Sequence, residues 1–73
     1  MKTAAQMVRD YRKERGITQV HISKATRITA SRISNIETGL SRMTADEFLN
    51  IIINGFNTTP QLFFDSQVSE IKG

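Results

Sequence analysis

The stretch that decides the fold runs from residue 18 to residue 39 and reads TQVHISKATRITASRISNIETG. Thr18 and Thr29 stand where a threonine oxygen can cap the first free amides of a helix. Apolar residues stand at helical spacing after each threonine, Ile22 and Ala25 in the first segment and Ile33 and Ile36 in the second. Gly39 stands where a left-handed residue would end the second segment. The stretch therefore predicts two short helices, joined by a tight turn over residues 26–28.

Three further helices are expected around this pair. A capping box at Thr3 and Gln6 predicts a first helix over residues 4–15. A second capping box, at 44–47, predicts an apolar helix that ends at residues 54–55. Pro60 suits the first turn of a last short helix. The fold class expected is all-α, with five short helices.

The length of 73 residues allows one domain. We expect residues 1–65 to form this domain, and residues 66–73 to be a polar C-terminal tail that is partly disordered or weakly extends the fifth helix. A chain this short buries only about 60% of its unfolded surface. Its stability is therefore expected to be modest, or to be completed by a partner subunit.

Charge is distributed unevenly along the chain. Residues 1–42 hold nine Lys or Arg and three acids, a balance of +6, whereas residues 43–73 hold one Lys and four acids, a balance of −3. A positive half of this kind favours a polyanionic partner, of which phosphate is the commonest. Charge alone leaves an ordinary solvated surface equally open.

The inventory of reactive side chains argues against an enzyme. The sequence contains no cysteine and only one histidine, His21, and it has no Gly-rich phosphate loop. We therefore expect no catalytic site, no metal site and no cofactor. The longest apolar run is 51–53, far below the roughly 20 residues of a membrane span. The lack of cysteine fits a reducing cytoplasm, where we expect the protein to be found.

The turn between two short helices also resembles a known signature, that of the Cro and phage-repressor helix-turn-helix regulators, or XRE family. The residues that carry the resemblance are Thr18, Gln19, Ile22, Ser23, Ile28, Thr29, Ser31, Ile33, Ser34, Ile36, Glu37 and Gly39. It extends to Arg12 and Gly16 before them and to Phe48, Pro60 and Phe63 after them. The resemblance implies a phage-repressor-like fold and a transcriptional regulator, expected to be a repressor, that inserts its third helix into the major groove.

The sequence departs from the family pattern at three positions. Arg27 stands where the turn usually has glycine, Ser23 where a small alanine is usual, and Met43 where proline is common. A non-glycine residue at positive φ costs on the order of 1 kcal/mol. Arg27 therefore either carries this strain or sits in a slightly rebuilt turn.

A narrower resemblance is to the N-terminal domains of Rgg and MutR regulators, and it rests on Ile36, Glu37, Gly39, Ser41, Phe48 and Leu49. In Rgg-like regulators a separate C-terminal domain dimerises and senses a peptide. This resemblance implies that the chain is the DNA-reading part of a longer protein, as an alternative to a complete small regulator.

The third helix would carry the base-reading residues. By resemblance to the family, these are Ala30, Ser31 and Asn35. The Asn35 amide can bond adenine bidentately, and Ala30 can touch a thymine methyl. Arg32 lies at the edge of this face, from which its guanidinium could reach a guanine or a phosphate.

Other residues are expected to hold the DNA backbone or the fold. Gln19 and Thr29 begin the second and third helices, whose free amides favour phosphate, and Lys24 and Arg42 are weaker phosphate candidates. Arg12 and Glu37 match paired positions of the family. The resemblance implies that they form a structural ion pair, not DNA contacts.

The partner expected is double-stranded DNA with an inverted repeat. One domain of this size contacts few base pairs, so we expect a homodimer, formed through the C-terminal region, and association with the nucleoid. The rival hypothesis is a protein-binding adaptor or antirepressor module on the same fold. Its candidate contacts are apolar residues near the C-terminus: Leu62, Phe64, Val68 and Ile71.

Overall fold

The computed structural model describes residues 2–72, and the side chains of residues 2–68. All of its regular structure is helical: α1 (Ala4–Glu14), α2 (Gln19–Thr26), α3 (Ala30–Thr38), α4 (Ala45–Asn50), the π-helical segment η1 (Ile51–Gly55) and α5 (Pro60–Lys72). Because η1 continues α4 without a break, the described chain has the five helices expected from the sequence, and the all-α prediction is confirmed.

A threonine oxygen caps each of the five helices. The side chains of Thr3, Thr18, Thr29 and Thr44 accept hydrogen bonds from amides in the first turns of α1 to α4. Thr59 does the same for α5, accepting from Leu62 N at 3.2 Å. Both predicted capping boxes are present. These local bonds explain why the helix starts could be predicted closely from the sequence.

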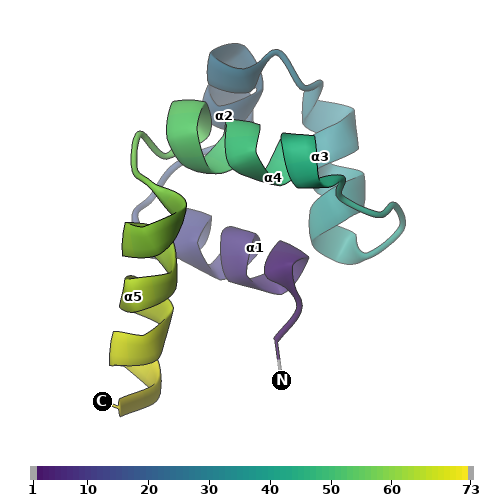
Figure 1. Cartoon of the computed structure of the whole chain (residues 1–73). Helices are drawn as coiled ribbons and strands as arrows, with labels where there is room; N and C mark the ends of the chain where they lie inside the picture. Colours follow the sequence, from purple (N-terminus) through teal and green to yellow (C-terminus); the bar gives the residue numbers. More distant parts are fainter. Residues whose placement is uncertain (1, 73) are drawn as a thin grey trace.

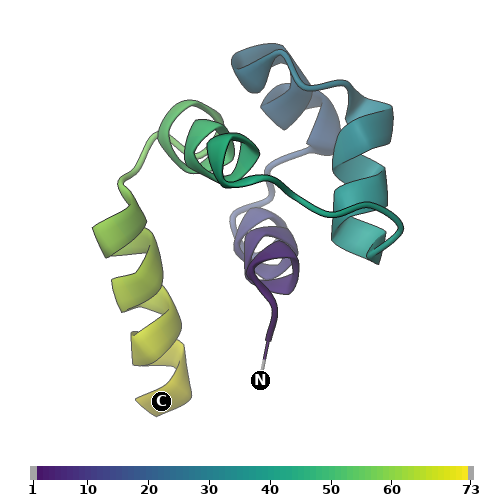
Figure 2. The same cartoon turned by 45° about the vertical axis from the view of Figure 1, so that its right-hand side comes forward.

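The helices are arranged so that α3 has one side open. Helices α2 and α3 lie together at one end of the molecule, while α4 and η1 cross above α1 (Figure 1). Helix α5 lies on the other side of α1 and α4 from α2 and α3 (Figure 2). The C-terminal helix therefore leaves the outer side of α3 uncovered.

The core is built from isoleucines and aromatic rings. Its buried members are Val8, Tyr11, Ile22, Ile33, Ile51, Ile52, Phe56 and Phe63. The Tyr11 ring packs against two phenylalanines, with centroid distances of 4.6 Å to Phe56 and 5.1 Å to Phe63. Burial of these rings ties α5 to α1 and η1 and supplies much of the apolar surface that a chain this short can remove from water.

The fourth helix differs from the prediction in its winding. It ends at Gly55, as expected, but from Ile51 onward it is a π-helix, and the Phe56 amide donates to Ile51 O at 2.8 Å. A Cβ at Gly55 would lie 3.2 Å from Ile22 Cδ1 and 3.3 Å from Thr26 Cγ2. The absence of a side chain here therefore lets η1 pack closely against α2.

Residues beyond 65 continue α5. Of the two alternatives expected for residues 66–73, a partly disordered tail or a helix extension, the structure has the extension as far as Lys72, while Gly73 lies outside the described residues. Gln67 is buried. Leu62, Phe64 and Val68 are exposed, and the side chain of Ile71 lies outside the described part. No helix within residues 2–72 is long and apolar enough to span a bilayer.

Candidate nucleic-acid interface

The turn between α2 and α3 contains a residue in the left-handed backbone conformation, and this residue is not glycine. Arg27 has φ 66° and ψ 11°, and its amide donates to Ser23 O at 2.8 Å. Of the two alternatives for Arg27, the structure therefore has the strained residue and not the rebuilt turn. A strained non-glycine residue persists only where its surroundings hold it in place.

Thr26 and Asn50 provide that hold. The Thr26 hydroxyl donates to Ile22 O at 2.7 Å and accepts from the Ile28 amide at 3.2 Å. The Asn50 side chain on α4 donates to Thr26 O at 2.9 Å, which satisfies a carbonyl at the end of α2. Neither residue was predicted to act at the turn. Thr26 directly precedes Arg27, which is the only local signal for its role, and nothing in the sequence points to Asn50.

Two of the expected base-reading residues, Ser31 and Asn35, lie on the same face of α3, and Ala30 begins the helix beside them. Ser31 is exposed, Ala30 and Asn35 are half-buried, and the spacing of Ser31 and Asn35 is one helical turn. Within the described side chains, no group hydrogen-bonds the Asn35 amide. Its donor and acceptor are therefore available to an outside partner.

One side of α3 is fastened to α1 by a buried ion pair. Arg12 Nε donates to Glu37 Oε2 at 2.7 Å and Arg12 Nη2 donates to Glu37 Oε1 at 2.8 Å. The side chains are only 12% and 2% exposed. Burial would raise the pKa of Glu37, but hydrogen bonds from Arg12 and Gln19 outweigh it and hold the pKa of this carboxyl below its usual value. The structure thus contains the pair that the family resemblance implies.

Gln19 belongs to the same network. Its Nε2 donates to Glu37 Oε1 at 2.9 Å, which orients the side chain toward α3. A phosphate contact by the Gln19 side chain would have to use the second N–H of Nε2. Otherwise the phosphate would bind the backbone amides at the start of α2.

The other side of α3 is fastened to α4 by a second pair, which the sequence did not indicate. Arg32 Nε donates to Glu47 Oε2 and Arg32 Nη2 to Glu47 Oε1, both at 2.9 Å. Arg32 Nη2 also donates to Arg42 O at 2.8 Å. Hydrogen bonds from the Arg32 side chain and from the Thr44 backbone amide lower the pKa of Glu47 to about 2. Arg32, expected to reach a base or a phosphate, is thus bonded within the protein.

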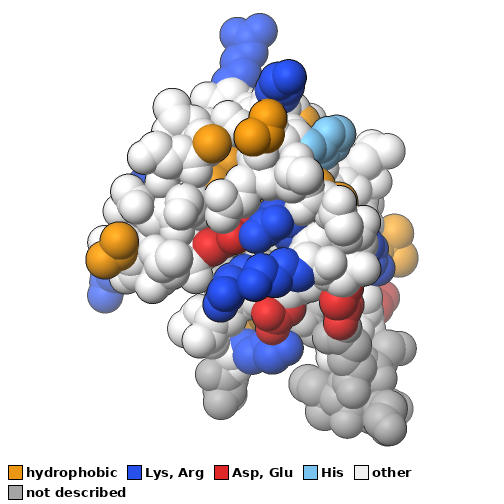
Figure 3. Space-filling model, turned by 180° about the vertical axis from the view of Figure 1, so that it is seen from behind, with side chains coloured by type: hydrophobic (Ala, Val, Ile, Leu, Met, Phe, Trp, Pro, Cys, Tyr) orange, Lys and Arg blue, Asp and Glu red, His pale blue; other side chains and the backbone are white. Residues whose placement is uncertain are grey.

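The remaining phosphate candidates lie at the surface. Thr29 caps α3 by accepting from the Arg32 amide at 3.1 Å, and Lys24 and Arg42 are exposed. Figure 3 shows the face seen from behind, on which Lys and Arg side chains lie along the upper edge and in a band across the middle, with Asp and Glu beside the band. The positive charge in the middle of this face is therefore partly neutralised by acids, whereas the Lys and Arg side chains at the upper edge have no acid beside them in this view.

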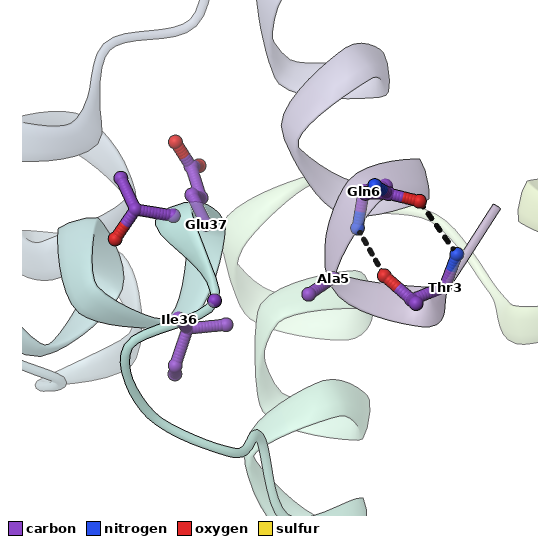
Figure 4. Close-up of a pocket in the computed structure, with 7 residues that line it drawn as sticks. Thr3, Ala5, Gln6, Ile36 and Glu37 are labelled. Atoms are coloured by element: carbon purple, nitrogen blue, oxygen red, sulfur yellow. Dashed lines mark hydrogen bonds between the residues drawn. The ribbon is translucent and has the colours of Figure 1, made fainter.

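A pocket of about 170 Å³ lies between the start of α1 and the end of α3 (Figure 4). Its polar lining is already bonded: Thr3 and Gln6 pair in the capping box, and Glu37 binds Arg12 and Gln19. The pocket is therefore a gap between two helices whose polar groups are satisfied by the protein itself.

The geometry is that of two short helices joined by a left-handed turn, with an open polar face on the second helix. A family of helix-turn-helix domains matches residues 8–63. The chain belongs to this family. It is the family of Cro and the phage repressors, so the chain is a DNA-binding helix-turn-helix protein. No curated protein and no solved structure matches the chain.

Proposed function

We propose that this helix-turn-helix protein is a sequence-specific transcriptional repressor that places α3 in the major groove. The observation that carries the proposal is the outer face of α3, where Ala30, Ser31 and Asn35 are accessible and the Asn35 amide has no bond to another described side chain. A recognition helix reads base edges with side chains of this kind near its start.

Within this proposal, each residue has a separate part. Asn35 bonds an adenine through its amide, Ser31 bonds a neighbouring base edge, and Ala30 contacts a thymine methyl. The amides at the starts of α2 and α3, together with Gln19, Thr29, Lys24 and Arg42, hold phosphates. The protein has no catalytic role in this scheme, and its binding to DNA places it at the nucleoid.

The operator is proposed to be an inverted repeat bound by a homodimer. Phe64 and Val68 are 45% and 52% exposed and lie one turn apart on α5. Because α5 lies on the far side of the molecule from α3, a contact there would leave both recognition helices free (Figure 2). Half-sites about 34 Å apart would then be read together.

The test is selection of duplexes from a random DNA library at near-physiological salt, with the wild-type chain, Asn35→Ala and Asn54→Ala. Asn54 is exposed on η1 and its amide donates only to Asn50 Oδ1, at 2.8 Å, so its variant makes the same chemical change outside the proposed interface and leaves the bond from Asn50 Nδ2 to Thr26 O in place. We expect wild type and Asn54→Ala to enrich the same inverted repeat. Asn35→Ala should lose about 1–3 kcal/mol of discrimination per half-site.

Two results would contradict the proposal. If the folded wild type enriches no sequence, it does not bind DNA sequence-specifically. If it binds the palindromic site as a monomer at every concentration, it is not a homodimer. The second candidate function, a protein-binding adaptor or antirepressor, is favoured by the exposed Leu62, Phe64 and Val68. An adaptor would bind its partner with little dependence on salt, whereas affinity for DNA falls steeply as salt rises.

A further inference from the structure

Arg32 is held at three points. Its Nε and Nη2 donate to the two carboxylate oxygens of Glu47, and Nη2 donates again to the carbonyl of Arg42. Glu47 Oε1 also accepts from the Thr44 amide at 2.9 Å, in the capping box of α4. One guanidinium therefore links the first turn of α3 to the loop before α4 and to the first turn of α4.

The same loop is tied to α3 at a second place. The Ser41 amide donates to Asn35 O at 3.1 Å, so the backbone of a proposed base-reading residue supports the loop. Loop residues 39–44 thus join α3 through Asn35 at one point and through Arg32 at another. A shift of the loop or of α4 would move the outer face of α3.

A contact between DNA and Nε or Nη2 of Arg32 would have to break this arrangement, and only Nη1, which no described group binds, could approach DNA without doing so. The guanidinium would give up three hydrogen bonds, and the Glu47 carboxylate would be left without its positive partner close to a polyanion. A phosphate or guanine offers at most a bidentate contact in return. The exchange loses one hydrogen bond and adds a repulsion between the carboxylate and the DNA.

We propose that Arg32 is a positioning residue, which sets the angle of α3 through Glu47 and the Arg42 carbonyl without touching DNA. This inference rests on the proposed DNA-binding function. It changes the role expected of Arg32 from the sequence, and it adds Glu47, an acid, to the residues on which recognition depends.

The test compares wild type, Arg32→Met, Glu47→Gln, the double variant and Asp46→Asn. Asp46 is an exposed acid beside Glu47, so its variant removes the same charge without touching Arg32. Each protein is titrated with the selected operator and with a scrambled duplex of the same length at several salt concentrations. The readouts are the ratio of the two affinities and the salt slope, corrected for the folded fraction from urea unfolding.

If Arg32 positions α3, both single variants lower the specificity ratio by roughly fivefold to tenfold, and the double variant is no worse than either. The salt slope of Arg32→Met stays that of wild type, and Asp46→Asn keeps the wild-type ratio. Loss of stability alone would not move the ratio, because both duplexes bind the same folded protein.

The opposite role predicts opposite signs. If Arg32 bound DNA directly, Glu47→Gln would free it and raise the ratio or leave it unchanged, and Arg32→Met would lower the magnitude of the salt slope by about 1. Either result, with wild type binding its operator, overturns this inference and leaves the proposed function intact. Failure of the wild type to prefer any operator overturns both.

Discussion

The recognition helix is held by two Arg–Glu pairs of the same geometry in different surroundings. Both are bidentate, with N···O distances of 2.7 and 2.8 Å between Arg12 and Glu37 and of 2.9 Å between Arg32 and Glu47. The first pair is 12% and 2% exposed, and the second is 34% and 21% exposed. Hydrogen-bond geometry therefore does not distinguish them, and burial does.

The difference in burial separates a role in folding from a role in alignment. A buried charge that loses its partner cannot be solvated, so the fold itself depends on the pair of Arg12 and Glu37. A half-buried charge that loses its partner can still be solvated by water, so the pair of Arg32 and Glu47 should contribute less stability and mainly restrict geometry. Breaking each pair should therefore affect different measurements.

The largest effect is expected from breaking the buried pair. Arg12→Met leaves the Glu37 carboxylate buried with only the Gln19 bond, and it also removes the bond from Arg12 Nη1 to Ile17 O. We expect the free energy of unfolding to fall by about 3–5 kcal/mol. Urea unfolding followed by circular dichroism measures this change.

A matched double variant separates the cost of an unpaired charge from the value of the pair. Arg12→Met combined with Glu37→Met removes both charges and should recover part of the loss, because apolar side chains replace a buried ion pair with little penalty. If the single variant loses less than about 1 kcal/mol, the pair of Arg12 and Glu37 contributes no more stability than the pair of Arg32 and Glu47. The two pairs would then not differ in their roles.

An intermediate effect is expected at the turn where α3 begins. Arg27→Gly relieves the positive φ of 66° but makes the unfolded chain more flexible, so we expect a net gain of about 0.5–1 kcal/mol. Arg27→Ala is the control, since it removes the same side chain and keeps the strain. An Arg27→Gly variant less stable than Arg27→Ala by about 0.5–1 kcal/mol would mean that the backbone at Arg27 is not strained, and the difference is read from thermal or urea unfolding.

The sequence predicted the features of the fold that depend on neighbours along the chain. Thr3 and Thr44 begin their helices as expected, because a capping bond joins residues three apart. The winding of η1 was not predictable in this way, since it accompanies a close approach of Gly55 to Ile22 that only the packed fold creates.

The candidate site was predictable to the extent that a family pattern supplied it. The resemblance paired Arg12 with Glu37, although 25 residues separate them. The partners of Arg32 and Thr26 were missed because they lie 15 and 24 residues away, on a helix whose angle the periodicity does not set. The capping box of α4 already explains an acid at position 47, so the pattern did not indicate that Glu47 also has a partner on another helix.

The smallest effect is expected from the exposed pair, and pH makes it measurable. Glu47→Gln removes the carboxylate but keeps a capping box, as Gln6 does in α1, so the change isolates the ion pair. At neutral pH we expect a loss of about 0.2–0.5 kcal/mol of unfolding free energy.

Folding lowers the pKa of Glu47 from 4.5 to about 2, so the stability that its charge contributes is present above pH 4.5 and is lost as the pH falls toward 2. The difference between wild type and Glu47→Gln should therefore shrink over that interval in urea unfolding measured at several pH values. A difference that grows as the pH falls, or one at neutral pH as large as that of Arg12→Met, would place both pairs in the same energetic class. Recognition and folding would then depend on the same contacts on both sides of α3.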